Sequence, residues 1–177
     1  MNYKLSEKTN QILNDKSLSF KKASIDDLEN ILDLYQERMK WFKEKEIKQW
    51  SKYLEHHPKE EFIDVINNSN YFILKENNNI IAGFELSTDS KYWKDEITKA
   101  YYIYKLVIKV GYKNIGELIF EICKDITKNN NMSYLRLDCL KNNNKLNQIY
   151  NNHGFKLIKN GYEDYYSYSL RELKIDE

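Results

Sequence analysis

Aromatic and acidic side chains alternate in the stretch that follows residue 36, and together they suit the binding of a cationic amine. Trp41 and Trp50 offer ring faces that attract an ammonium group, and Glu37 offers a carboxylate that can pair with it. A helix whose aromatic residues face the core explains the same pattern, so both interpretations stay open. Further members of the stretch are Tyr53, Glu44 and Glu46.

A second candidate lies where a strand-like stretch gives way to an amphipathic helix. The segment between them is Lys113-Asn-Ile-Gly-Glu117, with Gly116 as its glycine. Backbone N–H groups of a glycine-containing turn, together with the positive end of the helix that follows, can hold a phosphate group. An ordinary strand-to-helix turn is the alternative, and the pattern gains weight only from the elements that flank it.

The cysteines and histidines give no sign of a metal centre. Cys123 and Cys139 are isolated, and none of the three histidines lies in a cluster with them. We therefore expect free, partly buried thiols, no disulfide framework and no bound metal.

Length and charge restrict the class of protein. The 177 residues correspond to one domain, and 41% hydrophobic residues supply a core. The 28 basic and 27 acidic residues leave a net charge of +1, which argues against nucleic acid and an anionic bilayer as partners. No apolar run reaches the roughly 18 residues of a membrane span, and the first 14 residues lack the apolar stretch of a signal peptide. We therefore expect a cytoplasmic protein.

Hydrophobic periodicity predicts the elements that must position these residues. Strands are predicted over 18–23, 71–75, 80–86, 99–110, 133–140, 155–158 and 164–170. Helices are predicted over 3–15, 24–39, 43–54, 58–67, 116–129 and 142–152; Ser24 with Asp27 forms the capping box of the second, and Gly154 ends the last. The order predicts a single α/β domain over residues 1–177, with a mixed, mostly antiparallel sheet of six to seven strands flanked by helices. Residues 1–17 form a helical N-terminal extension.

Three segments resemble the GNAT superfamily of acetyl-CoA-dependent N-acetyltransferases. They are the residues 102–120, the residues 135–139 and the pattern Asn143-x6-Tyr150-x3-Gly154-Phe155. The resemblance extends from residue 18 to residue 170 and includes the order of the elements. It implies a GNAT-like fold whose sheet splits between the fourth and fifth strands, with the acyl-thioester arm in the split.

The resemblance assigns Tyr150 as the general acid for the departing thiolate. A phenol with a pKa of about 10 can donate to a thiolate whose pKa is about 8.5. The alternative is that Tyr150 is one core tyrosine among fifteen. Glu85 is the candidate base, acting through water; its alternative is a solvated carboxylate on the face of a strand.

The coenzyme is expected along the fourth strand and the turn after it. The resemblance assigns coenzyme contacts to Leu106, Val107, Ile108, Lys113, Asn114, Ile115, Gly116, Glu117 and Asn143, with an oxyanion donor near Val107 or Ile108. The family pattern Gln/Arg-x-x-Gly-x-Gly/Ala is matched at Lys113 and Gly116, whereas Leu118 stands where Gly or Ala belongs. The alternative register keeps the phase of the following helix and implies that the phosphate-binding loop is shortened by about two residues, so the motif is damaged in either register. We expect acetyl-CoA to bind more weakly than is usual for the family, with Lys109 or Lys113 compensating.

Acceptor recognition in the family falls to the first two helices and the last hairpin. The candidates here are Trp41, Trp50 and Glu37, joined by Tyr102 and Tyr104, which share one face of the fourth strand. The resemblance implies direct transfer of an acetyl group from acetyl-CoA to a primary amine of a small molecule or peptide. A catalytically weak or inactive GNAT-fold module that binds acyl-CoA or regulates another protein is the alternative. An aminoacyl-tRNA or a protein terminus as acceptor, and a homodimer, also stay open.

Overall fold

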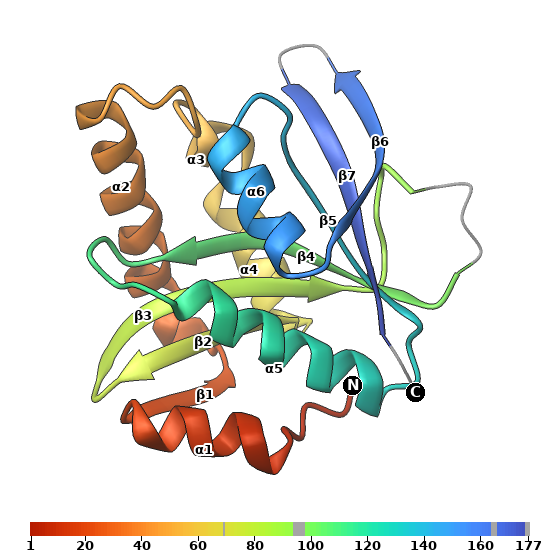
Figure 1. Cartoon of the computed structure of the whole chain (residues 1–177). Coiled ribbons are helices and arrows are strands. Elements are labelled where there is room, and N and C mark those ends of the chain that lie inside the picture. The colour runs from red at the N-terminus through yellow and green to blue at the C-terminus, as the bar shows by residue number, and fades with distance from the viewer. Residues whose placement is uncertain (69, 94–97, 164–165, 176–177) are drawn as a thin grey trace. The chain divides into compact units, whose positions relative to one another are not determined.

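The computed structural model describes residues 1–68, 70–93, 98–163 and 166–175. Within this part of the chain, seven strands form one sheet in the order β1-β2-β3-β4-β5-β7-β6 (Figure 1). The pairs β1–β2, β2–β3, β5–β7 and β6–β7 are antiparallel, and β4–β5 is parallel. The sheet is therefore the mixed, mostly antiparallel sheet with flanking helices that the sequence predicts.

The bounds of most elements agree with the predicted ranges within a few residues. The strands are β1 (Leu18–Lys22), β2 (Tyr71–Glu76), β3 (Asn79–Ser87), β4 (Ala100–Ile108), β5 (Tyr134–Leu140), β6 (Lys156–Glu163) and β7 (Tyr166–Lys174). The helices are α1 (Glu7–Asp15), α2 (Leu28–Glu44), α3 (Tyr53–His56), α4 (Lys59–Asn67), α5 (Ile115–Asn129) and α6 (Asn144–Asn152), and a 3-10 turn, Ile25–Asp27, precedes α2. None of these helices is long and apolar enough to cross a membrane.

The chain forms two compact units. Unit 1 consists of Met1–Thr9, Leu86–Tyr104 and Glu117–Glu177, and it holds β5, β6, β7, α6 and nearly all of α5. Unit 2 consists of Asn10–Glu85 and Lys105–Gly116, and it holds β1, β2, most of β3 and the helices α2 to α4.

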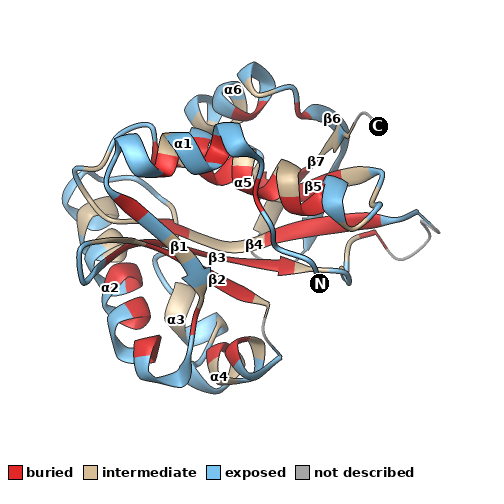
Figure 2. Ribbon diagram, turned by 90° about the horizontal axis from the view of Figure 1, so that it is seen from below, coloured by how far each residue is buried: buried red, intermediate tan, exposed pale blue. Residues whose placement is uncertain are grey.

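The core of unit 2 lies between its helices and one face of its strands. The buried face of α2 includes Leu28, Ile31 and Tyr35, spaced by three or four residues as an amphipathic helix requires (Figure 2). The Asp27 carboxylate accepts hydrogen bonds from the backbone N–H and the hydroxyl of Ser24, each at 3.0 Å. The predicted capping box is therefore confirmed.

The helix predicted over residues 43–54 is wrong. The structure extends α2 to Glu44 and then has a turn before the short α3. Glu46 and Trp50 have φ angles of 55° and 59°, and this left-handed conformation cannot continue a right-handed helix. Trp50 and Tyr53 imitate helical periodicity because both pack on Tyr35, although no continuous helix joins them.

The core of unit 1 lies around α5. Phe120 of this helix contacts Tyr150 and Phe155, with ring centroids 5.8 and 5.4 Å apart. Gly154 follows α6 with a φ of 84°, so the predicted left-handed cap is confirmed. The last hairpin is longer than predicted: β6 continues to Glu163 and β7 to Lys174, and the predicted start of the last strand at residue 164 lies outside the described residues.

Candidate active site

Tyr150 has a fixed ring and a hydroxyl that reaches solvent. The residue is 7% exposed, and its ring lies 5.8 Å from the rings of Phe120 and Phe155. The hydroxyl makes no hydrogen bond to the described residues. Because no fully buried polar side-chain atom among the described residues lacks a partner, this hydroxyl is open to water. Burial, followed by the nearby Cys139 and Asp138, raises the pKa of Tyr150, so the phenol keeps its proton at neutral pH.

A buried arginine anchors the helix that carries Tyr150. Arg171 of β7 is 4% exposed, and its Nε and Nη2 donate to Oδ1 of Asn147 at 2.9 and 2.8 Å. Its Nη1 donates to Oδ1 of Asn151 at 2.7 Å and to the carbonyl of Phe155 at 3.2 Å. These contacts lie on both sides of Tyr150 in the sequence, so they fix the orientation of α6. Sequence reasoning missed them, although the spacing of four between Asn147 and Asn151 places both on one face of a helix.

Asn143 begins α6. Its side chain accepts a hydrogen bond from the N–H of Leu146 at 3.0 Å, which is the contact of a helix N-cap. The capping role accounts for the residue type, and the predicted contact with coenzyme stays a prediction.

Cys139 and Cys123 are free and buried, as the sequence predicts. Cys139 lies on β5 with its Sγ 3.4 Å from Oδ1 of Asn147. Burial raises the pKa of the Cys139 thiol to about 11. The thiol therefore stays protonated at neutral pH. Among the described residues, no three His, Cys, Asp or Glu side chains are grouped to hold a metal ion.

Glu85 of unit 2 belongs to a buried ion pair. It is 8% exposed, and its Oε2 accepts a hydrogen bond from the Lys105 ammonium at 2.8 Å. The same ammonium lies 2.6 Å from Oε1 of Glu61. Burial opposes the ionisation of Glu61, but the hydrogen bonds from Lys105 and His57 prevail and lower its pKa. The interpretation of Glu85 as a solvated strand carboxylate is therefore wrong.

Two tyrosines hold the backbone of β4 at Lys105, where the φ angle is 48°. The Tyr35 hydroxyl donates to the Lys105 carbonyl and lies 2.9 Å from the Tyr71 hydroxyl. Gly83 makes room for Tyr71, because a Cβ there would lie 2.7 Å from the Tyr71 hydroxyl oxygen. This irregular point of β4 directly precedes the predicted coenzyme contacts, Leu106, Val107 and Ile108.

The turn after β4 uses a different glycine from the one that the sequence indicates. Gly111 has a φ of 91° and Asn114 a φ of 60°, so these two residues turn the backbone. Gly116 is the second residue of α5, and a Cβ there would meet only Ile108 Cδ1, at an ordinary 3.7 Å. The interpretation of Gly116 as the loop glycine is therefore wrong. The sequence signal for Gly111 was its position directly after the strand.

Lys113 and Asn114 are exposed in this turn, Ile115 is buried, and Glu117 lies exposed in the first turn of α5. Helix α2 contacts the chain on both sides of Lys109. Arg38 Nε donates to the Ile108 carbonyl at 3.1 Å. The Val110 N–H donates to Oε2 of Glu37 at 3.4 Å.

The predicted acceptor-binding aromatic residues of unit 2 have different surroundings. Trp50 packs within an aromatic stack, with ring centroids 5.7 Å from Tyr35 and 4.6 Å from Tyr53. Trp41 is half-buried, with the Arg38 guanidinium 5.2 Å from its ring, and Glu37 is exposed. The stack gives Trp50 a packing role in unit 2.

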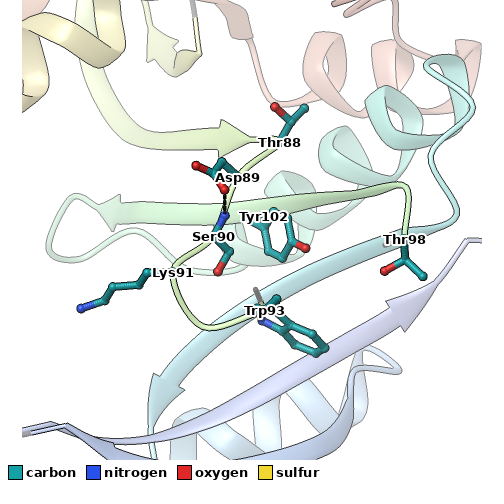
Figure 3. Close-up of a pocket in the computed structure, with 7 residues that line it drawn as sticks. All are labelled: Thr88, Asp89, Ser90, Lys91, Trp93, Thr98 and Tyr102. Atoms are coloured by element: carbon teal, nitrogen blue, oxygen red, sulfur yellow. Dashed lines mark hydrogen bonds between the residues drawn. The ribbon is translucent and has the colours of Figure 1, made fainter. Parts of the chain in front are cut away.

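Tyr102 and Tyr104 belong to unit 1, and Tyr102 lines a pocket. Tyr102 is 5% exposed and its hydroxyl accepts from Nη1 of Arg136 at 3.2 Å, whereas the half-buried Tyr104 donates to the Ser90 hydroxyl at 2.5 Å. Arg136 lies 4.1 Å from the Trp93 ring and is paired with Glu172 at 2.6 Å. The pocket has a volume of about 400 Å³ (Figure 3) and is lined by Thr88, Asp89, Ser90, Lys91, Trp93, Thr98 and Tyr102.

This chain has the GNAT fold. Four features define this class: the strand order, the parallel β4–β5 pair, the irregular point in β4, and the helices that follow β4 and β5. Solved structures of GNAT acetyltransferases agree with it. One is a GNAT-family acetyltransferase from Listeria monocytogenes, with a TM-score of 0.75, 20% identity and coverage of 89% of this chain and 94% of that one.

Two further solved structures have the same fold. The PaiA N-acetyltransferase of Thermoplasma acidophilum in complex with coenzyme A has a TM-score of 0.68 and 23% identity, covering 89% of this chain and 99% of that one. A GNAT-family acetyltransferase from Streptococcus agalactiae has a TM-score of 0.72 and 16% identity, covering 90% of this chain and 96% of that one. No family model and no curated protein matches the sequence.

Proposed function

We propose that this chain transfers an acetyl group from acetyl-CoA to a primary amine of a small molecule or peptide, with the whole chain acting as one acyltransferase domain. The observation that carries the proposal is Tyr150, whose ring is fixed by packing while its protonated hydroxyl is open to solvent. The GNAT fold supports it, as does the coenzyme A complex of the Thermoplasma acidophilum protein.

The proposed reaction is direct. The neutral amine attacks the thioester carbonyl carbon, a C–N bond forms, and the carbonyl oxygen becomes an oxyanion. The C–S bond then breaks, and the thiolate takes the proton of Tyr150, which is regenerated from solvent. The reactants are acetyl-CoA and the ammonium form of the amine. The nitrogen loses two protons in all: the thiol gains one through Tyr150, and the other is released to solvent. The products are therefore the acetylated amine, the free coenzyme thiol and one proton.

The coenzyme contacts remain those of the prediction. We assign the oxyanion to a backbone N–H within Leu106–Ile108, and the phosphates to the backbone amides of residues 113–117, with Asn143 as a further contact. The Tyr35–Tyr71 pair supports this assignment because it holds the β4 backbone next to Leu106. Since Glu85 already accepts a hydrogen bond from Lys105, we propose that amine protons leave through water and that Glu85 acts on that water.

The test is the release of free thiol from acetyl-CoA in the presence of a panel of primary amines, with the acetylated product detected by mass spectrometry. Amine-dependent thiol release with a matching product supports the proposal. Binding of acetyl-CoA without turnover on any amine would favour the alternative, a module that binds acyl-CoA. Absence of acetyl-CoA binding would overturn both.

A further inference from the structure

Helix α2 holds the end of β4 at two backbone carbonyls. Tyr35 and Arg38 lie three residues apart on α2, so they share one face of the helix. The Tyr35 hydroxyl donates to the Lys105 carbonyl. Arg38 donates to the Ile108 carbonyl through Nε, at 3.1 Å, and through Nη2. The two carbonyls lie at the two ends of the segment 106–108, beside α2 (Figure 1), and we call Tyr35 and Arg38 the α2 clamp.

A hydrogen bond to a backbone carbonyl also fixes the N–H of the next residue. The peptide group is planar and trans, so its C=O and N–H point in opposite directions. The bond from Tyr35 therefore sets the direction of the Leu106 N–H. At the other end of the segment, the Lys109 N–H donates to the Ile81 carbonyl of β3 at 2.8 Å. The peptide group whose carbonyl Arg38 holds is therefore fixed on both sides.

This part of β4 needs support from side chains. Among the described residues, β5 pairs with Ala100–Ile103 of β4 and with no residue further along that strand. Lys105 has a φ of 48°, a left-handed conformation that is uncommon for a residue with a side chain. Such a conformation persists only where the surrounding structure holds it. The α2 clamp supplies bonds that a neighbouring strand supplies elsewhere in the sheet.

The guanidinium of Arg38 is itself held in place. It lies 5.2 Å from the ring centre of Trp41 and 5.9 Å from that of Phe42. No carboxylate within the described part of the chain forms an ion pair with it, so its polar partner is the backbone of β4. The planar guanidinium presents donors in a fixed fork, whereas a lysine presents one compact charge. The residue type therefore suits the holding of a carbonyl in one direction.

We propose that Tyr35 and Arg38 are positioning residues for acetyl transfer, because they hold both ends of the segment 106–108 and so aim its N–H groups at the thioester carbonyl oxygen. The inference rests on the proposed function and deepens it. A donor stabilises the oxyanion when it lies about 2.7–3.1 Å from the position that this oxygen takes in the transition state. A shift of about 1 Å loses much of that effect. The clamp acts on the reaction through the backbone that it holds.

The first experiment examines the backbone and needs no turnover. Arg38→Met removes the donors of the clamp and keeps a long side chain, and its matched control is Lys40→Met, which removes a charge from an exposed position of the same helix. In Arg38→Met the NMR amide signals of residues 106–109 should shift, and their hydrogen exchange should become about tenfold faster or more. Lys40→Met should leave the signals and the exchange unchanged.

The second experiment uses turnover, with kcat expressed per folded molecule as urea unfolding gives it. Arg38→Met should lower kcat about tenfold or more while the Kd for acetyl-CoA stays within about twofold, because the oxyanion exists only after the amine has attacked. Arg38→Lys keeps a donor without the fork and should recover part of kcat. Tyr35→Phe releases the other end of the segment and should also lower kcat, so it tests the clamp independently if Arg38→Met does not fold.

The outcomes separate the clamp from the proposed function. Amides of residues 106–109 that respond to neither Arg38→Met nor Tyr35→Phe overturn the clamp without any assay of activity. Amides that respond while kcat is unchanged overturn the positioning role and leave the acetyl transfer standing. A raised Kd for acetyl-CoA with unchanged kcat also overturns that role, since Arg38 would then be a coenzyme contact. Responding amides in a protein that acetylates no amine overturn the proposed function, and the positioning role with it.

Discussion

The two units each bury tyrosines, and they treat the hydroxyl groups differently. In unit 2, Tyr35 and Tyr71 are fully buried and their hydroxyls bond to each other and to the Lys105 carbonyl. In unit 1, Tyr150 is nearly as buried, but its hydroxyl bonds to none of the described residues. Burial raises the pKa of all three phenols. Burial alone therefore does not distinguish the three phenols; the unengaged hydroxyl of Tyr150 does, and the role proposed for this residue depends on it.

The buried cations of the two units differ in the same way. Lys105 is paired with two carboxylates, Glu61 and Glu85, so its charge is neutralised within unit 2. Arg171 donates to the neutral oxygens of Asn147, Asn151 and Phe155. We therefore assign the first cluster to stability and the second to the position of α6. Four variants or conditions test this division.

Lys105→Met should have the largest effect, and the effect should be on stability. The change leaves Glu85 and Glu61 without their cation, and breaking a buried pair on one side costs about 3–5 kcal/mol. Urea unfolding measures the loss. The control is Lys124→Met, which breaks the more exposed pair with Glu121 and should cost no more than about 1 kcal/mol. Equal losses for the two variants would contradict the structural role of Lys105.

Tyr150→Phe should lower turnover about 100-fold or more, the usual effect of losing a general acid, while coenzyme affinity and stability hardly change. No hydrogen bond to a described residue is lost and the ring volume is kept. Steady-state kinetics with a verified acceptor measure the effect. Tyr101→Phe, in another buried tyrosine of unit 1, is the matched control and should keep wild-type turnover. Wild-type turnover in Tyr150→Phe would show that Tyr150 only packs in the core and is not the general acid.

Trp50→Ala should lower stability by about 2 kcal/mol, less than the 3–5 kcal/mol of a fully buried tryptophan, because Trp50 is half-buried in its stack. The KM for the amine should not change in the fraction that is folded. Thermal unfolding and kinetics, measured on the same sample, separate the two effects. A raised KM with unchanged stability would place Trp50 in the acceptor site, which is one of the two interpretations that the sequence leaves open.

Salt should have the smallest effect. If Lys109 and Lys113 compensate for a shortened phosphate loop, raising the salt concentration from about 0.01 to 0.15 M shortens the Debye length from about 30 to 8 Å and should weaken acetyl-CoA binding several-fold. Calorimetry across this range measures the change, and Lys113→Met should reduce the salt dependence. Tight binding that does not respond to salt would show that backbone amides suffice.

The sequence by itself determined the features that depend on neighbours along the chain. The capping box at Ser24 and Asp27 involves residues three apart, and the left-handed residue Gly154 directly follows its helix. The hairpin of β2 and β3 and the stripe of α5 follow from short-range periodicity, so they could be predicted, and the order of the elements then gave the fold class. Tyr150 was found through a motif whose members lie within twelve residues of one another.

Only the tertiary structure decided which charges and hydroxyl groups are already engaged. Glu85 and Lys105 lie 20 residues apart, Asn147 and Arg171 24 apart, and Tyr166 and Asp138 28 apart. A hydrogen bond requires its two atoms within about 3 Å of each other, and strand register and helix orientation set such distances, not local pattern. For the same reason the stretch that follows α2 imitated a helix: the rings of Trp50 and Tyr53 both lie against Tyr35 without sharing a helical face.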